Sequence, residues 1–358
     1  MSPIILYLLT SLDTTGGTVS KIKSTFKYTK YKVYVGAHYN RENEVFIKSW
    51  LVDNNIHIIN TPPRTFSKIL QSVFLLNKFI KKENIKIVHV FFPYETYIAY
   101  FLKILNPKLR IVRSFEGNVK RNFMIRTISK MILPRFDKII YISKYVKEFY
   151  ENLTNKCKSK IIIDNPGYHL SEYELRKKGL ICNIVSVAGI NPMKNVFMYA
   201  EIGKVLKERN FSFVLKVVGD GPLYKDLEKK IIEYKINDCV KLMGKQVDPK
   251  PYYKEADIYI HPADKEGFGI VVPEAMSSGL PVIVSNKGGL PELVSNMEDG
   301  IVVDAYKAEE WAEAVIKLYN NRALYDKISQ NGYNTYKKRF TPKIYASKLD
   351  LLYDGLLK

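Results

Sequence analysis

Short apolar runs recur along the chain, and many of them are separated by stretches whose apolar residues follow the spacing of a helix. In the first half these runs predict seven strands, at Ile4–Leu9, Lys32–Val35, Ile56–Ile59, Ile87–Phe92, Arg110–Arg113, Lys138–Ile142 and Ile161–Ile163. Continuous apolar runs of this kind are typical of strands that are covered on both faces. Helical patterns between them, such as 66–82, predict a mostly parallel sheet with right-handed crossovers.

A polar segment at residues 171–179 interrupts this alternation and is the predicted domain boundary. The same plan then repeats. Further strands are predicted at Cys182–Val187, Phe213–Val218, Val240–Met243, Ile258–His261, Val282–Ser285 and Ile301–Val303, and helices at Val196–Glu208, Leu223–Tyr234, Pro273–Ser278, Glu309–Asn320 and 323–339. The sequence therefore predicts an α/β protein with two Rossmann-like, doubly wound domains, residues 1–170 and 180–340. Ligands should bind in a cleft at the carboxyl ends of their strands.

Length and cysteine content fit this picture. A chain of 358 residues is about right for two domains of roughly 100–200 residues each. The three cysteines, Cys157, Cys182 and Cys239, lie far apart without C-x-x-C spacing, so neither disulfides nor a zinc site are predicted. The first apolar run is far shorter than the ~20 residues of a spanning helix and has no basic leader. We therefore expect a cytoplasmic protein.

The positive charge is concentrated in the first half of the chain. Residues 1–179 carry 31 basic and 13 acidic side chains, a net +18, whereas residues 180–358 carry 25 and 23, a net +2. This asymmetry indicates a polyanionic partner or surface. The stretch 118–136 alternates basic and apolar residues without an acid. It is either a surface helix with its apolar face in the core or a helix that docks on an anionic membrane leaflet, and the charge asymmetry favours the second interpretation.

Two acids stand out in the stretch DKEGFGIVVPEAMSSGLPVIVSNKGG, residues 264–289. Glu266 follows a predicted strand, and Glu274 follows Pro273, which is expected to start a helix. Glu274 alone could be an acid that stabilises the start of that helix. Gly267 and Gly269, however, permit close approach of a ligand to backbone N–H groups ahead of the helix, which suits an anion such as phosphate.

This stretch resembles the E-x7-E signature of retaining GT-B glycosyltransferases of glycosyltransferase family 4. The similarity runs almost without interruption through residues 255–305, including Gly279-Leu280-Pro281 and Gly288-Gly289. The resemblance implies that Glu266 binds hydroxyls of the donor sugar and that Glu274 binds the ribose of the nucleotide, with Phe268, Gly269 and Ile270 as further donor contacts. Carboxylates suit these roles because an ionised acid accepts two hydrogen bonds from neighbouring hydroxyls.

Lys194 and two glycine-containing turns in the second half also match the same family. Lys194, in AGINPMKN, lies where the family lysine neutralises the donor diphosphate, but Gly189 replaces the usual arginine five positions earlier. Lys245, a lysine of the first domain or a cation could compensate for that loss.

Two turns resemble the nucleotide side of the family's site. Gly219 and Gly221, in VVGDGP, match the V-G-D-G-P turn, and Gly244-Lys245 matches the place where the base is held largely by backbone atoms. Without the neighbouring E-x7-E signature both would be interpreted as ordinary turns between a strand and a helix.

The first domain matches the family less well. Gly16 and Gly17 resemble the glycine pair that contacts the donor phosphate and sugar, although a simple turn is the alternative. Glu116 occupies the position where many relatives carry a histidine near the sugar, and it could instead be a surface acid. The resemblance also implies that the final amphipathic segment, Pro342–Leu357, crosses back to the first domain, where Leu349, Leu352, Tyr353 and Leu356 should pack.

The resemblance implies a retaining glycosyltransferase that uses a UDP- or GDP-linked sugar and a glycan or lipid-linked acceptor, in the synthesis of a surface polysaccharide such as lipopolysaccharide or capsule. No cofactor or metal is expected, because no D-x-D motif or metal-ligand histidine spacing is present. The enzyme should bind the inner face of the membrane peripherally through its basic domain. A GT-B nucleotide-sugar epimerase is the alternative, and the chain lacks the motifs of nucleic-acid-binding proteins.

Overall fold

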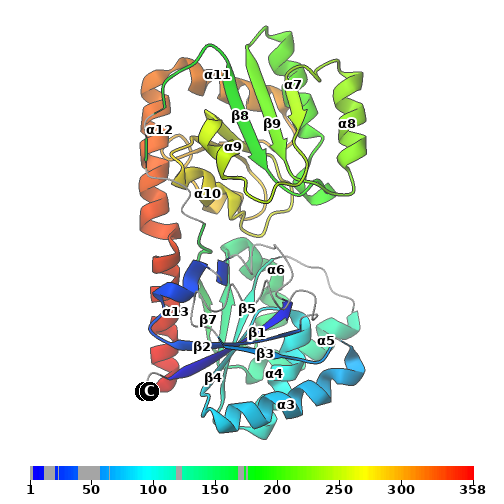
Figure 1. The fold of residues 1–358 in the computed structure, drawn as a ribbon, viewed down its shortest axis with the longest axis vertical. Coiled ribbons are helices and arrows are strands. Elements are labelled where there is room, and N and C mark those ends of the chain that lie inside the picture. The colour runs from blue at the N-terminus through cyan, green and yellow to red at the C-terminus, as the bar shows by residue number, and fades with distance from the viewer. Residues whose placement is uncertain are drawn as a thin grey trace. The chain divides into compact units, whose positions relative to one another are not determined.

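The computed structural model describes residues 3–11, 21–22, 24–38, 57–63, 65–117, 123–167, 173–174 and 176–358. The chain divides into two compact units. Unit 1 comprises Met1–Asn165 together with Pro342–Lys358, and unit 2 comprises Pro166–Thr341. Each unit contains a parallel sheet with helices on its two faces (Figure 1).

Unit 1 is built on a seven-stranded sheet whose strand order is β3-β2-β1-β4-β5-β6-β7. The strands are β1 (Ile4–Ser11), β2 (Lys32–His38), β3 (His57–Asn60), β4 (Ile87–Val90), β5 (Arg110–Phe115), β6 (Lys138–Tyr141) and β7 (Lys160–Ile162). Its helices are α3 (Ile69–Lys82), α4 (Pro93–Leu105), α5 (Phe123–Ile132), α6 (Lys144–Thr154) and α13 (Pro342–Leu357), with short turns η1 (Phe26–Tyr28), η3 (Phe66–Lys68) and η4 (Leu133–Arg135). All seven strands predicted for this half are present within a few residues.

Unit 2 repeats the architecture with six strands in the order β10-β9-β8-β11-β12-β13. The strands are β8 (Cys182–Val187), β9 (Phe213–Val218), β10 (Val240–Leu242), β11 (Ile258–His261), β12 (Val282–Ser285) and β13 (Ile301–Val303). Its helices are α7 (Met198–Glu208), α8 (Tyr224–Glu233), α9 (Lys250–Glu255), α10 (Val271–Ser277), α11 (Ala308–Asn320) and α12 (Arg322–Thr335), with short turns η5 (Pro192–Lys194) and η6 (Leu290–Glu292) and a π-helical segment, η7 (Tyr336–Phe340), directly after α12. The strand order reverses between β8 and β11, which is where doubly wound sheets bind ligands. The predicted α/β fold class is confirmed.

Two boundaries differ from the sequence prediction. Helix α10 begins at Val271, so the expectation that Pro273 starts it is wrong. Proline is tolerated at the third position because the first N–H groups of a helix have no acceptor within it. The division between the units falls at Asn165, before the polar segment 171–179. Residues 166–167 belong with unit 2 because Gly167 N–H donates to the Phe340 carbonyl at 3.0 Å.

The last helix, α13, forms part of the core of unit 1. Leu349, Leu352 and Tyr353 are buried in the cluster that surrounds β1 and β2, and Leu356 packs against it. The Tyr353 hydroxyl contacts the Tyr7 hydroxyl at 2.9 Å. In unit 1, α13 therefore contributes both apolar packing and a buried hydrogen bond.

Buried His89 extends this polar contact into the sheet. Its Nδ1 lies 2.6 Å from the Tyr353 hydroxyl, and its Nε2 lies 2.7 Å from the Ser114 hydroxyl. Burial, reinforced by the positive charges of Lys21 and Arg113, lowers the pKa of His89 well below its usual value. The imidazole is therefore neutral, and each of its nitrogens has a hydroxyl partner.

Replacing Tyr353 with phenylalanine should lower the free energy of unfolding by about 1–3 kcal/mol, because buried Tyr7 and His89 would each lose a hydrogen-bond partner. Chemical denaturation of the full chain measures the change. Tyr28→Phe, at a half-exposed position of the same unit, is the control and should stay within about 0.5 kcal/mol of the wild type. Equal stability of the two variants would contradict the buried network.

Candidate active site

Three loops meet at the carboxyl ends of β8, β9 and β10, and glycines set their spacing. Gly219 N–H donates to the Gly244 carbonyl at 2.9 Å. Gly219 and Gly221 have φ angles of +149° and +159°, and a Cβ on them would lie 1.9 Å from the Ala188 oxygen and 2.4 Å from the Ile190 oxygen. Only glycine permits so close an approach of two backbones. The N–H groups of both glycines are engaged, since Gly221 N–H donates to Asp220 Oδ1 at 2.7 Å, and the contact of this turn with a nucleotide stays a prediction.

The loop that carries Lys194 is tied to the loop that follows β11. Turn η5 ends at Lys194, and the Asn191 side chain caps its start by accepting from Met193 N–H at 3.0 Å. The Met193 carbonyl accepts from the N–H groups of Asp264 and Lys265, at 3.1 and 3.0 Å. Two backbone hydrogen bonds therefore fix the position of Lys194 relative to the loop of Glu266.

Glu266 is held by two partners from different elements. Its Oε2 forms an ion pair with Lys194 Nζ and accepts a hydrogen bond from His261 Nε2 at 3.3 Å. Burial raises the pKa of Glu266, but the hydrogen bond from His261 and the charge of Lys194 outweigh burial and lower the pKa to about 2. Glu266 is therefore ionised at neutral pH, which suits a carboxylate that accepts hydrogen bonds.

His261 is buried at the end of β11 and stays neutral. Burial lowers its pKa and Lys194 adds to this effect, while Glu266 opposes it. A neutral imidazole that donates from Nε2 must accept at Nδ1, and the Tyr259 hydroxyl lies 3.1 Å from that atom. The tautomer of His261 is therefore set by Tyr259 on one side and Glu266 on the other.

The second acid of the signature is buried and connects to the same group of rings. Glu274 lies in the first turn of α10, and its Oε2 accepts from the Tyr253 hydroxyl at 3.3 Å. Tyr253 stacks on Tyr259, with ring centroids 5.8 Å apart. Tyr253, Tyr259 and His261 thus form a buried aromatic chain that links the two glutamates. Burial raises the pKa of both tyrosines well above the usual value, so both keep their protons.

Two family models match the sequence, one in each half of the chain. Residues 31–170 match Glycosyltransferase Family 4, and residues 176–335 match Glycosyl transferases group 1. The chain is a GT-B glycosyltransferase of the family 4 type. The second match contains Lys194 and both glutamates.

Relatives of this glycosyltransferase include an uncharacterized glycosyltransferase, one named for amylovoran biosynthesis and one named as a galactosyltransferase. An uncharacterized glycosyltransferase of Methanocaldococcus jannaschii, MJ1178, is 25% identical over 91% of each chain. The amylovoran biosynthesis glycosyltransferase AmsK of Erwinia amylovora is 30% identical over 46% of this chain and 43% of its own. An Escherichia coli UDP-Gal:alpha-D-GlcNAc-diphosphoundecaprenol alpha-1,3-galactosyltransferase is 31% identical over 37% of this chain and 35% of its own.

A solved structure gives the same fold over almost the whole length. Anabaena Alr3699/HepE, crystallised with UDP and glucose, superposes with a TM-score of 0.81 at 15% identity, covering 99% of this chain and 100% of that one. The likeness shows that the two Rossmann-like domains of this glycosyltransferase have the GT-B fold.

The loop between Glu266 and α10 is shaped by two further glycines of the signature. Gly269 has a φ of +88°, and a Cβ there would lie 3.2 Å from Cγ of Glu266. Gly288 has a φ of +63°, and a Cβ there would lie 2.4 Å from the Glu266 carbonyl oxygen. The neighbouring Gly289 N–H donates to that oxygen at 2.8 Å. The glycines thus hold the backbone of Glu266 in place.

The remaining predicted donor contacts of unit 2 differ in exposure. The Phe268 ring is buried against Phe340, with centroids 5.9 Å apart. Ile270 caps the start of α10 and is half-buried. Lys245 and Gly189 are exposed. The structure therefore groups Lys194, Glu266 and Glu274 through a set of contacts, whereas Lys245 stands apart as a surface cation.

Glu116 lies in unit 1, directly after β5, in a buried ion pair that the sequence gave no reason to expect. Its Oε2 accepts from Lys21 Nζ at 2.5 Å, and Lys21 also donates to Asn165 Oδ1 at 3.1 Å. Burial lowers the pKa of Lys21, while Glu116 raises it. Oε1 of Glu116 has no hydrogen-bond partner among the described residues. Gly16 and Gly17 lie outside the described residues.

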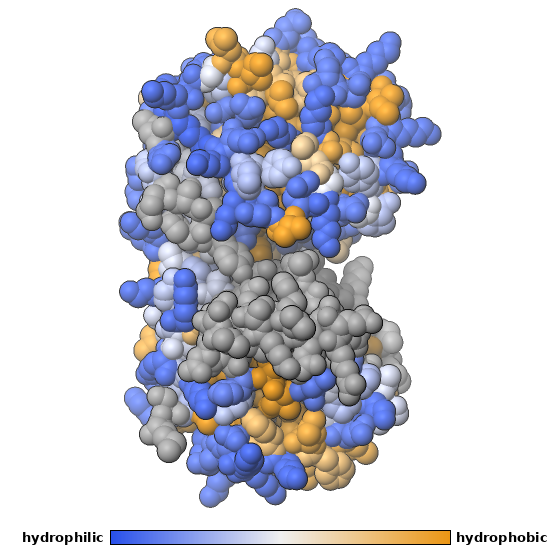
Figure 2. Space-filling model, in the orientation of Figure 1, coloured by the Kyte–Doolittle hydropathy of each residue, from blue (hydrophilic) through white to orange (hydrophobic). Residues whose placement is uncertain are grey.

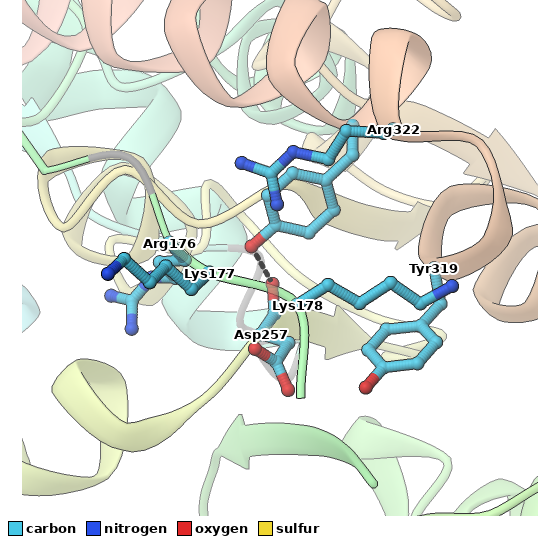
Figure 3. A pocket seen from close by; sticks show the side chains of 7 residues that line it. Arg176, Lys177, Lys178, Asp257, Tyr319 and Arg322 are labelled. Carbon is cyan, nitrogen blue, oxygen red and sulfur yellow. Dashed lines mark hydrogen bonds between the residues drawn. The ribbon is translucent and has the colours of Figure 1, made fainter. Parts of the chain in front are cut away.

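A small hollow in unit 2 is lined mainly by basic side chains, but most of them are already engaged. It lies near the start of β11, at the opposite edge of the sheet from Glu266, and holds about 10 Å³, little more than one water. Figure 3 shows the hollow between residues 176–178, α11 and α12. Its lining residues are Arg176, Lys177, Lys178, Asp257, Tyr319, Arg322 and Tyr325. Arg176 donates to the carbonyls of Tyr253 and Ser278 at 3.0 Å each. We interpret this cluster as structural, because Arg176 connects α9 with the end of α10 through these hydrogen bonds.

Sequence reasoning missed the buried aromatic chain and Lys21. His261 ends a strand five residues before Glu266, and that proximity in the sequence is a usable signal of their contact. Within the described ranges, no group of three or more His, Cys, Asp or Glu side chains could hold a metal ion. No described helix is long and apolar enough to span a bilayer.

Proposed function

We propose that this glycosyltransferase moves a sugar, with retention of configuration, from a UDP- or GDP-linked donor to a lipid-linked glycan acceptor in surface polysaccharide synthesis. The observation that carries the proposal is the contact of Lys194 with Glu266 beside the glycine turns of unit 2. The Escherichia coli relative supports the substrate classes, since its name gives UDP-galactose as donor and a diphosphoundecaprenol-linked sugar as acceptor.

The donor would be held by three features of unit 2. Glu266, ionised and fixed by His261, accepts hydrogen bonds from sugar hydroxyls, and Glu274 accepts from the ribose. Lys194 has three N–H donors, of which Glu266 takes one, so the others can reach the diphosphate. The backbone at Gly219, Gly221 and Gly244 would line the nucleotide. We assign Lys245 a supporting contact with the base or its phosphates, because it is exposed beside Gly244.

In the proposed reaction the bond between the anomeric carbon and the diphosphate oxygen breaks, and the acceptor oxygen bonds to that carbon on the same face. The acceptor proton passes to the departing phosphate. Lys194 stabilises the negative charge that develops on the leaving group, as preorganised donors do in other enzymes. The residues just described supply positive charge without a metal, so we propose that the reaction is metal-independent.

Unit 1 would contribute contacts to the sugar and the acceptor. Glu116 is oriented by Lys21 and keeps Oε1 uncommitted among the described residues, so we assign it a hydrogen bond from a sugar hydroxyl. Gly16 and Gly17 remain the predicted contacts with phosphate. The basic character of this half of the sequence would hold the enzyme at the cytoplasmic face of the membrane.

A thermal-shift panel of UDP- and GDP-sugars tests donor binding, because a ligand at about 100 times its Kd adds roughly 2.7 kcal/mol of stability. The preferred donor, radiolabelled, should then transfer its sugar to lipid-linked glycan from a membrane extract. No thermal shift with any nucleotide sugar would contradict the proposal. Release of a free epimer without transfer would favour an epimerase instead.

A further inference from the structure

Unit 1 exposes a row of large apolar side chains along α3 and the turn before it. Phe66, Leu70 and Phe74 follow one another at intervals of four residues and are 86%, 58% and 68% exposed. Ile69 and Val73, on another side of the helix, are buried in the unit. Helix α3 therefore satisfies the core with one face and still presents a second apolar face to solvent, which is unusual for a surface helix.

Helix α4 continues this surface. Phe101, Ile104 and Leu105 are exposed on it, and α4 lies alongside α3 (Figure 1). Two hydrogen bonds join the helices: Tyr94 OH donates to the Thr65 carbonyl at 3.0 Å, and Asn106 Nδ2 donates to Asn77 Oδ1 at 2.7 Å. The set of exposed apolar residues, here called the α3–α4 face, is Phe66, Leu70, Phe74, Leu75, Phe101, Ile104 and Leu105. Figure 2 shows apolar surface gathered over these helices.

The surroundings of the α3–α4 face are positively charged. The exposed cations are Lys68, Lys78, Lys81, Lys82 and Lys108. Segment 65–82 contains no acidic residue, and Glu95, the acid of α4, is buried. An apolar strip bordered by lysines matches the boundary between acyl chains and anionic headgroups, where buried apolar area and charge attraction both contribute to binding.

We propose that the α3–α4 face docks unit 1 on an anionic lipid leaflet, which rests on the proposed function only in that docking would bring the enzyme to a lipid-linked acceptor. A second copy of the chain fits the face less well, because pairing the α3–α4 faces of two copies would bring their exposed lysines together. An anionic leaflet attracts each such lysine by about 1 kcal/mol.

Helix α5 exposes basic side chains and packs most of its described apolar side chains against unit 1. It lies in the basic stretch that the sequence associated with the membrane. Ile132 is buried in unit 1, and Ile125 and Ile128 are half-buried. Met131 is exposed, together with Arg126 and Lys130. The described part of α5 therefore fits the alternative of a surface helix that uses its apolar side for packing.

Co-sedimentation with vesicles tests the docking surface. The wild-type chain should bind phosphatidylcholine vesicles that contain phosphatidylglycerol, and bind pure phosphatidylcholine much more weakly. The double variant Phe66→Ser/Phe74→Ser should lower the partition coefficient at least about tenfold, because two inserted aromatic rings are lost. Lys78→Gln/Lys81→Gln/Lys82→Gln should weaken binding to anionic vesicles and reduce its sensitivity to salt.

Matched controls remove an equally exposed apolar side chain elsewhere. Ile232→Ser on α8 and Leu351→Ser on α13, at positions 60% and 71% exposed, should bind vesicles like the wild type. If the double variant also binds like the wild type, the α3–α4 face is not the docking surface. If instead it changes only the sedimentation coefficient, from dimer to monomer, the face is a contact between copies and the proposal is overturned.

The donor thermal shift separates this proposal from the proposed function. Every docking variant should keep the nucleotide-sugar shift of the wild type, because none of the residues changed is among the donor contacts assigned in either unit. Vesicle binding without any nucleotide-sugar shift would contradict the proposed function and still support the docking surface. A normal nucleotide-sugar shift without binding to anionic vesicles would contradict the docking surface and leave the proposed function in place.

Discussion

Replacing Lys194 with alanine should reduce kcat for sugar transfer by about 10²–10³-fold, the usual effect of removing one preorganised donor from a developing negative charge. Lys194 is the cation that contacts Glu266, and the usual family arginine is replaced by Gly189. The leaving diphosphate would therefore depend on Lys194 more than in relatives with both cations. Lys194→Arg should recover part of the rate, because it keeps the charge but changes its position.

A charge-matched control is available in the neighbouring loop. Lys265 is exposed, and its contact with the Lys194 loop is made by its backbone N–H, so Lys265→Ala should leave that contact and the rate unchanged. Steady-state kinetics with a saturating donor measures kcat, and thermal unfolding checks that both variants are folded. A Lys194→Ala enzyme with the kcat of the Lys265→Ala control would exclude Lys194 from leaving-group stabilisation.

Much of the fold could be predicted because its strands are covered on both faces. Runs such as Cys182–Val187 and Val282–Ser285 are mostly apolar, and their bounds in the structure equal the predicted ones. The start of α10 was misplaced because proline, although favoured at the first position of a helix, is also tolerated at the third. Sequence periodicity could not distinguish these positions.

Residues of the candidate site could be predicted only where they belong to one short sequence signature. Glu266 and Glu274 belong to a local signature, and the structure finds both beside glycine-shaped loops. Tyr253 reaches Glu274 across 21 residues, and Lys21 reaches Glu116 across 95. Such contacts are made by the order of strands in a sheet, which leaves no period or spacing in the sequence. The partners that orient the acids therefore emerged only from the fold.

These partners matter because, in the proposed function, the two acids would bind the donor only while they are ionised and correctly placed. Burial alone would raise the pKa of Glu266 and favour its neutral form. Lys194 and His261 reverse that tendency from two directions, one by charge and one by a hydrogen bond. If Lys194 turns part of its charge toward a bound diphosphate, His261 becomes the contact that holds the carboxylate.

Replacing His261 with leucine should therefore weaken binding of the nucleotide sugar by about tenfold, the effect of losing one hydrogen bond to a charged group. Binding of the nucleoside diphosphate without its sugar should change less than about twofold, because Glu266 is assigned to the sugar alone. His261→Gln places an N–H donor near Glu266 and should restore most of the affinity. A general structural defect would weaken both ligands equally, so calorimetric titration with each ligand distinguishes the two explanations.

The pH dependence of the same variants gives a second measurement. In the wild type the pKa of Glu266 is lowered to about 2, so the carboxylate is ionised at every pH above that range and its contribution is lost only as the pH falls through about 2. Without His261, Lys194 is the remaining side-chain partner of Glu266 among the described residues, and the pKa of Glu266 should move back toward about 4.3, the ordinary value for glutamate. Sugar-dependent affinity of His261→Leu should then decline between about pH 6 and 4, whereas the wild type stays level there. Level profiles for both proteins would show that His261 does not control the ionisation of Glu266.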